Sequence, residues 1–328
     1  MSKGLNWKEE YFNEDGKYEK GTIEKEEIFF DRIALQIREV VKHYKEANNN
    51  IPARAIHAKT LAGFTDAVFR VLPGLPQDLN AGFLIPGKEY RATVRFSNAS
   101  GEIIDDDSKP DLRGIAVRID AGKDGHDLLM TNAELHHAKD AREAMFAIRA
   151  GVEKDIMEDK IPDQFPLESE IAEMIGALPF LLKNLGFKTT IHIAGTLRKQ
   201  MKIKVKSLST ETFWSRASVA IGNSITPEKS VAVKFRLRPQ KIKPEQDEIK
   251  EGEKNLRQKI ESELREDDIK FYFEVQRFKD EESTPVEDAR ISWGDDTSFK
   301  TIAELIIPKN SKNESELVGC TCIQSVEC

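Results

Sequence analysis

Two short segments of the chain carry residues that could move protons and hold an anion. His57 ends a short apolar run that comes directly after Arg54. Arg95 and Ser97 follow later, in a stretch of alternating polarity. Residues two apart on a strand share a face, so Arg95 and Ser97 are expected to point the same way. An imidazole titrates near neutral pH and can take up and return a proton. An arginine fork fits a carboxylate. The spacing therefore predicts a proton-transfer site beside an anion-binding group.

Each of these residues also has a purely structural interpretation. A histidine on an apolar surface is often a hydrogen-bonded core residue. Arg95 would be costly on the inside of a barrel without an anion, and an internal Asp or Glu could be that anion. Ser97 could fix the tautomer of His57 or make ordinary strand-end hydrogen bonds. Arg54 could be a second anion ligand or a solvated surface residue.

The middle of the chain predicts strands. Apolar and polar residues alternate with period two in four segments, which is typical of half-buried antiparallel strands: 92–97, 114–119, 231–238 and 271–276. These strands do not alternate regularly with helices, which argues against a parallel doubly wound sheet. The pattern favours an α+β fold, an antiparallel β-barrel with inserted and flanking helices.

Helical periodicity appears at several places along the chain. Apolar residues recur at three and four residues after Glu24, which predicts an N-terminal helix. Residues 140–151 predict a second helix, and residues 168–186 predict helix with a kink or break at Pro179. Leu256, Ile260 and Leu264 predict a surface helix. We expect a flexible arm over 1–23, one domain over 24–309 and a flexible cysteine-bearing tail over 310–328.

Composition excludes several classes of protein. The 328 residues carry 50 basic and 57 acidic side chains, a net charge of -7, with both signs mixed along the chain. This distribution lacks the basic footprint of a nucleic-acid-binding protein. No run approaches the ~18 apolar residues of a membrane span. The N-terminus has no signal-peptide core, and the three cysteines all lie in the last segment, so we expect a cytoplasmic protein.

Four motifs occur in order and resemble the haem-side signature of catalases and their smaller relatives. They are Arg54-Ala55-Ile56-His57-Ala58-Lys59, Val94-Arg95-Phe96-Ser97, Asp111-Leu112-Arg113-Gly114-Ile115-Ala116-Val117-Arg118, and Asp127-Leu128-Leu129-Met130-Thr131-Asn132. Later segments, such as Phe271-Tyr272-Phe273-Glu274-Val275-Gln276 and Thr284-Pro285-Val286-Glu287-Asp288, are similar to the small catalase-related proteins. The resemblance extends over residues 25–308.

This resemblance implies an eight-stranded antiparallel barrel that binds haem b. It assigns proton transfer to His57, orientation of His57 to Ser97, and polarisation of a bound peroxide to Asn132 or Thr131. Haem contacts would come from Arg54, Arg95, Ile56 and Phe96, with the two arginines holding propionates. The substrate would be hydrogen peroxide or an organic (lipid) hydroperoxide, turned over by a catalase- or peroxidase-like haem oxidoreductase with a role in oxidative stress. The family also implies a homo-oligomer.

The chain departs from the family pattern at three places. The family's iron ligand is a late tyrosine, and the tyrosines here are Tyr11, Tyr18, Tyr44, Tyr90 and Tyr272, none of them after the last strand. Counting along the fourth motif puts Thr131 at the position of the family's asparagine, and a one-residue slip on a strand reverses its face. An aromatic pair of the family is replaced by His136 and His137, which we expect to point apart, either at the surface or in a more polar pocket.

The departures leave alternatives open. The metal ligand is unknown. Cys320 and Cys322 are thiolate candidates, although cysteines in a tail such as this one, which ends in Cys328, are usually exposed thiols. The barrel could instead have lost haem and act as a binding or structural module, for example for an apolar ligand. A second chain could also complete the site.

Overall fold

The computed structural model describes most of the chain after residue 53. The described residues are 54, 56–100, 103, 107, 111–122, 125–141, 143–148, 150, 169–200, 202–222, 230–241, 255–294 and 297–320, with seven residues between 34 and 46. The predicted arm over 1–23 lies outside the described residues. Those seven N-terminal residues are helical, as the periodicity predicts, and Val40 among them is buried.

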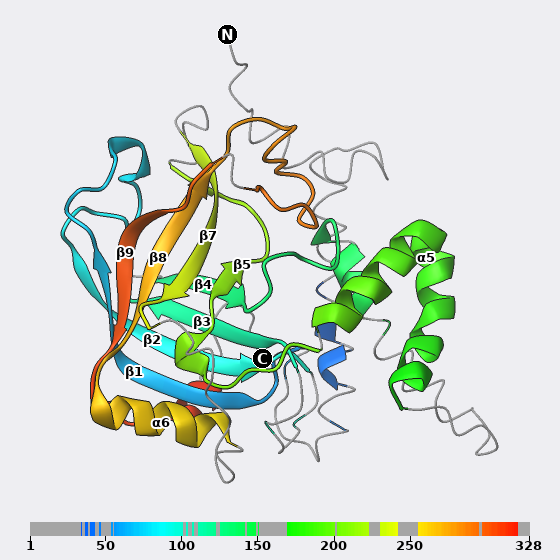
Figure 1. The fold of residues 1–328 in the computed structure, drawn as a ribbon, viewed down its shortest axis with the longest axis horizontal. Coiled ribbons are helices and arrows are strands. Elements are labelled where there is room, and N and C mark those ends of the chain that lie inside the picture. Colours follow the sequence, from blue (N-terminus) through cyan, green and yellow to red (C-terminus); the bar gives the residue numbers. More distant parts are fainter. Residues whose placement is uncertain are drawn as a thin grey trace.

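A single antiparallel sheet closes into a barrel (Figure 1). Its order is β5-β4-β3-β2-β1-β9-β8-β7, and the pairing of β5 with β7 closes the ring, while the short β6 pairs with β7. This confirms the predicted eight-stranded antiparallel barrel. The strands are β1 (Thr60–Val71), β2 (Glu89–Asn98), β3 (Arg113–Ile119), β4 (His126–Thr131), β5 (Phe213–Ser215), β6 (Val219–Ile221), β7 (Val231–Pro239), β8 (Ile269–Arg277) and β9 (Lys300–Ile307).

The alternation of the strands decides which side chains fill the barrel. Val94 and Phe96 of β2 lie in the core together with Ile115 and Val117 of β3. Their neighbours, including Arg95, therefore face the outside of the barrel. Aromatic rings pack at the centre, where Phe69 contacts Phe83 at 5.7 Å and Phe273 at 5.4 Å between ring centroids.

Helices flank the barrel on two sides (Figure 1). The helix α6 (Leu256–Glu266) buries Leu256, Ile260 and Leu264, which confirms the predicted stripe. The helix α5 (Ser169–Gln200) stands beside the barrel and has a small apolar cluster of its own, formed by Ala150, Leu181 and Ile193. Two short 3-10 helices, Gln77–Leu79 and Leu208–Thr210, lie in loops between the strands and helices.

The break in α5 is not where the sequence predicts it. The helix runs through Pro179 and is interrupted at Gly186, whose φ of 76° and ψ of 171° are non-helical. Glycine adopts this positive-φ backbone without a Cβ penalty, which a proline cannot do. The predicted interruption of this segment is present, but the non-helical residue is Gly186 and Pro179 lies within the helix.

The last described segment also differs from the prediction. Residues 310–320 are part of the predicted tail, yet they include the helix α7 (Ser315–Cys320), which packs on β1. The amide of Glu314 donates to the Gly63 carbonyl at 2.8 Å, and the Gly63 amide donates to Asn313 Oδ1 at 3.0 Å. A Cβ at Gly63 would lie 2.8 Å from Val318 Cβ, so the close contact requires glycine there. Residues 321–328 lie outside the described residues.

Among the helices that the structure describes, none combines the length and apolar character that crossing a bilayer requires.

Phe69→Ala should destabilise the barrel, since Phe69 is fully buried between rings from two other segments. We expect a loss of about 3–5 kcal/mol in the free energy of unfolding, measured by urea titration followed by circular dichroism. Phe187→Ala is the matched control, because Phe187 is 71% exposed, and it should change stability by less than about 0.5 kcal/mol. Equal losses in the two variants would contradict the core described above.

Candidate functional site

The backbone at His57 is held in an unusual conformation. Its φ of 58° lies in the left-handed region that residues with a Cβ rarely adopt. The His57 amide donates to the Ala99 carbonyl at 3.0 Å, and the Arg95 guanidinium donates to the His57 carbonyl at 2.7 Å. Strain of this kind persists only where surrounding contacts fix it, and it is concentrated at functional sites.

The imidazole of His57 rests on the outer wall of the barrel at a glycine. A Cβ at Gly114 would lie 2.6 Å from His57 Nδ1 and 2.8 Å from Ser97 Oγ, so any larger residue would displace the ring. His57 Nδ1 is hydrogen-bonded to Ser97 Oγ at 3.1 Å, as the sequence predicts. Because Ser97 pairs with Gly114 across β2 and β3, the sheet register brings the three residues together.

The surroundings of His57 keep its imidazole neutral. Burial lowers the pKa to about 4, a backbone hydrogen bond at Asn98 opposes this shift, and the charges of Arg95, Arg216 and Arg54 lower the pKa further. At neutral pH the ring can therefore accept a proton, as a general base must.

Among the described residues, Arg95 is bound by neutral groups and not by the internal Asp or Glu that the sequence offered as an alternative. It faces away from the barrel core and is 7% exposed. Its guanidinium donates to Thr60 Oγ1 at 2.9 Å and to the carbonyls of His57 and Ala58 at 2.7 and 3.3 Å. Burial and then the charge of Arg54 lower its pKa to about 9. Among the described residues no carboxylate forms an ion pair with Arg95, so it braces the His57 segment while its charge stays uncompensated.

Arg54 lies at the end of α7. It donates to the Gly319 carbonyl at 3.3 Å, and a Cβ at Gly319 would lie 3.0 Å from Thr60 Oγ1. The C-terminal end of α7 is thus next to Thr60, which also binds Arg95. The two arginines that the resemblance assigns to propionates lie on one side of His57, close to the last described residues of the chain.

Thr131, rather than Asn132, shares the face of His57. Thr131 pairs with Gly114 across β3 and β4, so its side chain lies on the same side of the sheet as Gly114 and Ser97. Asn132 turns away, and its Oδ1 accepts from the Arg113 amide at 2.8 Å while its Nδ2 donates to Glu211 at 3.3 Å. The sequence left these two residues as alternatives, and the sheet register brings Thr131 to the site.

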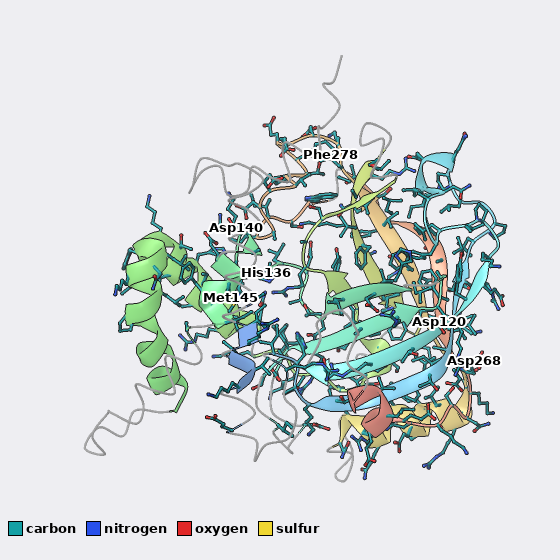
Figure 2. All side chains as sticks on the ribbon, turned by 180° about the vertical axis from the view of Figure 1, so that it is seen from behind. Asp120, His136, Asp140, Met145, Asp268 and Phe278 are labelled. Atoms are coloured by element: carbon teal, nitrogen blue, oxygen red, sulfur yellow. The ribbon has the colours of Figure 1, made fainter. Side chains whose placement is uncertain are left out.

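Arg216 and two histidines, His136 and His137, extend the site. The sequence patterns do not predict Arg216. Arg216 follows β5 and donates to Thr131 Oγ1 at 3.0 Å. The rings of His136 and His137 stack at 4.3 Å between centroids instead of pointing apart as predicted. Burial and then the charge of Arg216 lower the pKa of His136 to about 4. Figure 2 shows His136 between the barrel and the helices. No local pattern marks Arg216, because its partners come from distant segments.

The two apolar residues predicted to contact haem, Phe96 and Ile56, lie in different surroundings. Phe96 is fully buried inside the barrel, where its ring lies 5.8 Å from that of Phe213, on the opposite side of β2 from Ser97. Ile56 is 42% exposed. Phe96 therefore lies on the opposite face of the sheet from His57, whereas Ile56 directly precedes His57 and is partly open to a ligand.

His57, Ser97 and Thr131 would line one side of a haem, and the described residues supply no ligand for the other side. At the position of Thr131 the family pattern has an asparagine. Both described tyrosines belong to barrel strands, Tyr90 to β2 and Tyr272 to β8, where Arg238 stacks on the Tyr272 ring. Within the described part of the chain no three His, Cys, Asp or Glu side chains gather into a metal site. Cys322 and Cys328 lie outside the described residues.

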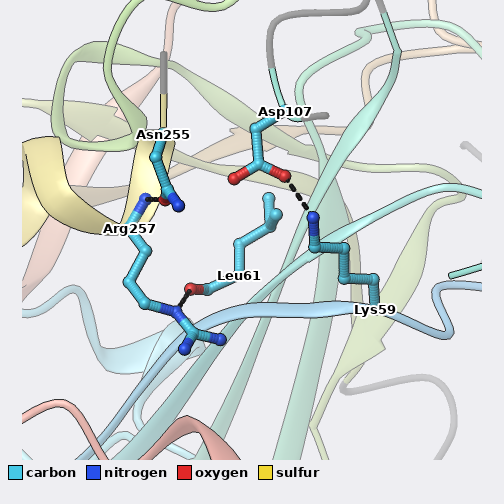
Figure 3. Close-up of a pocket in the computed structure, with 5 residues that line it drawn as sticks. All are labelled: Lys59, Leu61, Asp107, Asn255 and Arg257. Atoms are coloured by element: carbon cyan, nitrogen blue, oxygen red, sulfur yellow. Dashed lines mark hydrogen bonds and ion pairs between the residues drawn. The ribbon is translucent and has the colours of Figure 1, made fainter. Parts of the chain in front are cut away.

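A pocket of about 280 Å³ opens near the start of β1 (Figure 3). Its lining groups bind one another: Lys59 Nζ pairs with Asp107 at 2.6 Å, and Arg257 donates to the Leu61 carbonyl at 3.0 Å. Asn255 caps α6 by accepting from the Arg257 amide. These polar contacts are structural, and the pocket includes none of the His57 site residues.

Comparisons with known proteins agree with the fold. The family model Catalase matches residues 32–167. A bacterial catalase is 17% identical with a TM-score of 0.61, and the match covers 85% of this chain and 52% of that one. A fungal catalase is 16% identical (TM-score 0.59; 80% and 51% covered), and catalase A from Saccharomyces cerevisiae is 17% identical (TM-score 0.59; 83% and 54% covered).

The chain thus spans about half the length of these catalases. No curated protein matches it in sequence. The family match over residues 32–167 includes the segments that carry His57, Arg95, Ser97 and Thr131, and the barrel has the catalase fold. The chain is therefore similar to catalases, in sequence over residues 32–167 and in the fold of its barrel.

Proposed function

We propose that the protein is a haem-dependent oxidoreductase that processes a hydroperoxide, either hydrogen peroxide or an organic hydroperoxide. The observation that supports this best is the neutral, oriented imidazole of His57, which Gly114 and Ser97 hold on the outer wall of a catalase-like barrel. His57 is the catalytic residue of this proposal, Ser97 is its positioning residue, and Thr131 is the hydroxyl that contacts the bound peroxide.

The proton chemistry follows from the ring's hydrogen bonds. With Nδ1 bound to Ser97, Nε2 of His57 is the atom that exchanges a proton with the substrate. Nε2 takes the proton from a hydroperoxide ROOH and returns it to the outer oxygen, which leaves as an alcohol, or as water when the substrate is hydrogen peroxide. A bound haem would supply the two electrons for O–O cleavage and would accept the second oxygen atom, and a further peroxide or an organic donor would return the two electrons. Arg54 and Arg95 would hold its carboxylates.

A second candidate function is a haem-free barrel that binds a ligand. It is favoured by the lack of a tyrosine at the His57 site among the described residues. In that case His57, Thr131 and Arg216 would line a binding surface and catalyse nothing. Assembly into a homo-oligomer and a cytoplasmic location stay predictions in either case.

Haem content is the first test. The full chain, expressed with a haem precursor, should contain about one haem per chain and show a Soret band. His57→Ala should keep the haem and lose peroxide turnover by about 10²–10⁴-fold, since general acid–base catalysis contributes that much. His126→Ala, an exposed histidine on β4, is the control. A colourless, folded protein would reject the enzyme in favour of the haem-free barrel.

Gly114→Ala tests the close packing of the His57 imidazole against Gly114. The added Cβ would lie within 3 Å of Nδ1, so the ring must move away from Ser97. We expect the pKa of His57, followed by NMR, to rise toward the ordinary histidine value, and peroxide turnover to fall by about 100-fold. Gly74→Ala, at a glycine with no atom within 4 Å of a new Cβ, should do neither. An unchanged His57 pKa in Gly114→Ala would show that the ring does not rest on this glycine.

The depressed histidine pKa values predict how stability depends on pH. His57 and His136 have a pKa of about 4 in the folded chain and about 6.5 when unfolded. Between these values the unfolded chain binds more protons, so stability should fall as the pH is lowered from about 7 to about 5. Urea midpoints across this range should fall less steeply for His57→Ala than for the wild type. Parallel curves would mean that His57 is not buried as a neutral ring.

A further inference from the structure

Arg216 is a half-buried cation, and among the described residues its hydrogen bonds go to neutral acceptors. One guanidinium nitrogen donates to Thr131 Oγ1 at 3.0 Å and to the Ala133 carbonyl at 3.3 Å, and a second nitrogen donates to Gln200 Oε1 at 3.5 Å. These contacts come from β4, from the chain after it and from the end of α5. Together they fix the guanidinium between the barrel and the helix, on the side of the sheet where His57 lies.

The charge of Arg216 has no counter-ion among the described residues. Three acidic residues on neighbouring segments have other partners: Glu134 accepts from Ser292, Glu143 accepts from the Lys139 amide, and Glu211 accepts from Asn132. Burial alone lowers the pKa of Arg216, to about 10, so the group stays charged at neutral pH. A guanidinium that is partly withdrawn from water without an anion beside it is destabilising, and a bound anion would offset that cost.

The neighbouring groups add a hydrogen-bonding position and no negative charge. His137 Nδ1 is buried and has no hydrogen-bond partner among the described residues. Burial, followed by the charges of His136 and Arg216, holds the pKa of His137 well below its usual range. A neutral ring can donate one N–H, so a ligand with two acceptor oxygens could bind Arg216 and His137 together.

We propose that Arg216 and His137 form an anion subsite beside His57, and that this subsite binds the carboxylate of an organic ligand. A carboxylate matches a single guanidinium in charge and in its two-oxygen geometry. A phosphate dianion would need further donors, and the described cluster offers one cation. The subsite goes beyond the proposed function, because anion binding requires no haem.

The carboxylate could belong to a small free acid or to one end of a longer substrate. Acetate and decanoate distinguish these sources, because they share the head group and differ in the apolar chain. Each is titrated into the full-length protein, as isolated, in chloride-free buffer by isothermal calorimetry. Arg216→Gln removes the charge and keeps a hydrogen-bond donor, Arg216→Lys keeps the charge, and Arg277→Gln removes an exposed charge that pairs with Asp78.

The wild type and Arg277→Gln should bind at least one of the two acids with the same dissociation constant. Arg216→Gln should weaken binding by at least about tenfold, because the bound carboxylate would then lack its partner charge. Arg216→Lys keeps that charge and should retain part of the binding. Binding of acetate as well as decanoate would assign the subsite to a free carboxylate, and binding of decanoate alone would assign it to an acid with an apolar chain.

Histidine NMR signals provide a second measurement that does not depend on turnover or haem. Because the charge of Arg216 lowers the pKa of His57, a bound carboxylate should raise that pKa in the wild type and leave it unchanged in Arg216→Gln. The proposal is overturned if neither acid binds the wild type, or if Arg216→Gln binds as tightly as the wild type. Either result would leave the haem measurement unaffected, so the two proposals fail separately.

Discussion

The close approach of the His57 imidazole to Gly114 is the contact on which the rest of the site depends. It requires a residue without a side chain at one position of β3, and it requires β2 and β3 to pair so that Ser97 lies opposite that position. It also requires a left-handed backbone at His57, which the Arg95 guanidinium and the Ala99 carbonyl hold in place. The outer face of the barrel thus orients the imidazole of His57. A shift of one residue in the register of β2 would turn Ser97 to the core side.

Electrostatics then determine what that ring can do. Arginines surround His57, and the described contacts of Arg95 and Arg216 are with hydroxyl, amide and carbonyl oxygens rather than carboxylates. Their charges and the burial of the ring keep His57 neutral and ready to accept a proton. The same arrangement favours negatively charged ligands around the ring. Proton uptake and anion binding are therefore coupled, because an anion that neutralises an arginine makes His57 more basic.

The sequence predicts the parts of this structure that depend on local pattern. Period-two alternation predicted β2, β3, β7 and β8, and the resemblance of the ordered motifs to catalases predicted the eight-stranded barrel and the hydrogen bond between Ser97 and His57. It did not identify β9 or α7, whose position on β1 depends on the close contact of Gly63 with Val318. It could not decide between Thr131 and Asn132, since that depends on pairing across β3. Arg216 was missed because its contacts with Thr131 and Gln200 join three distant segments, and no spacing records them.

The energetic cost of the site bears on whether the barrel has kept a chemical role. A barrel that served only as a scaffold would gain stability by relaxing the left-handed backbone of His57 and by replacing the half-buried Arg216 with an apolar residue. This chain has both features, together with histidines whose neutral state costs stability as the pH falls. Costs of this kind concentrate where a ligand or a reaction uses them. The retained site therefore favours a bound ligand beside His57, even though the described residues supply no tyrosine to hold an iron.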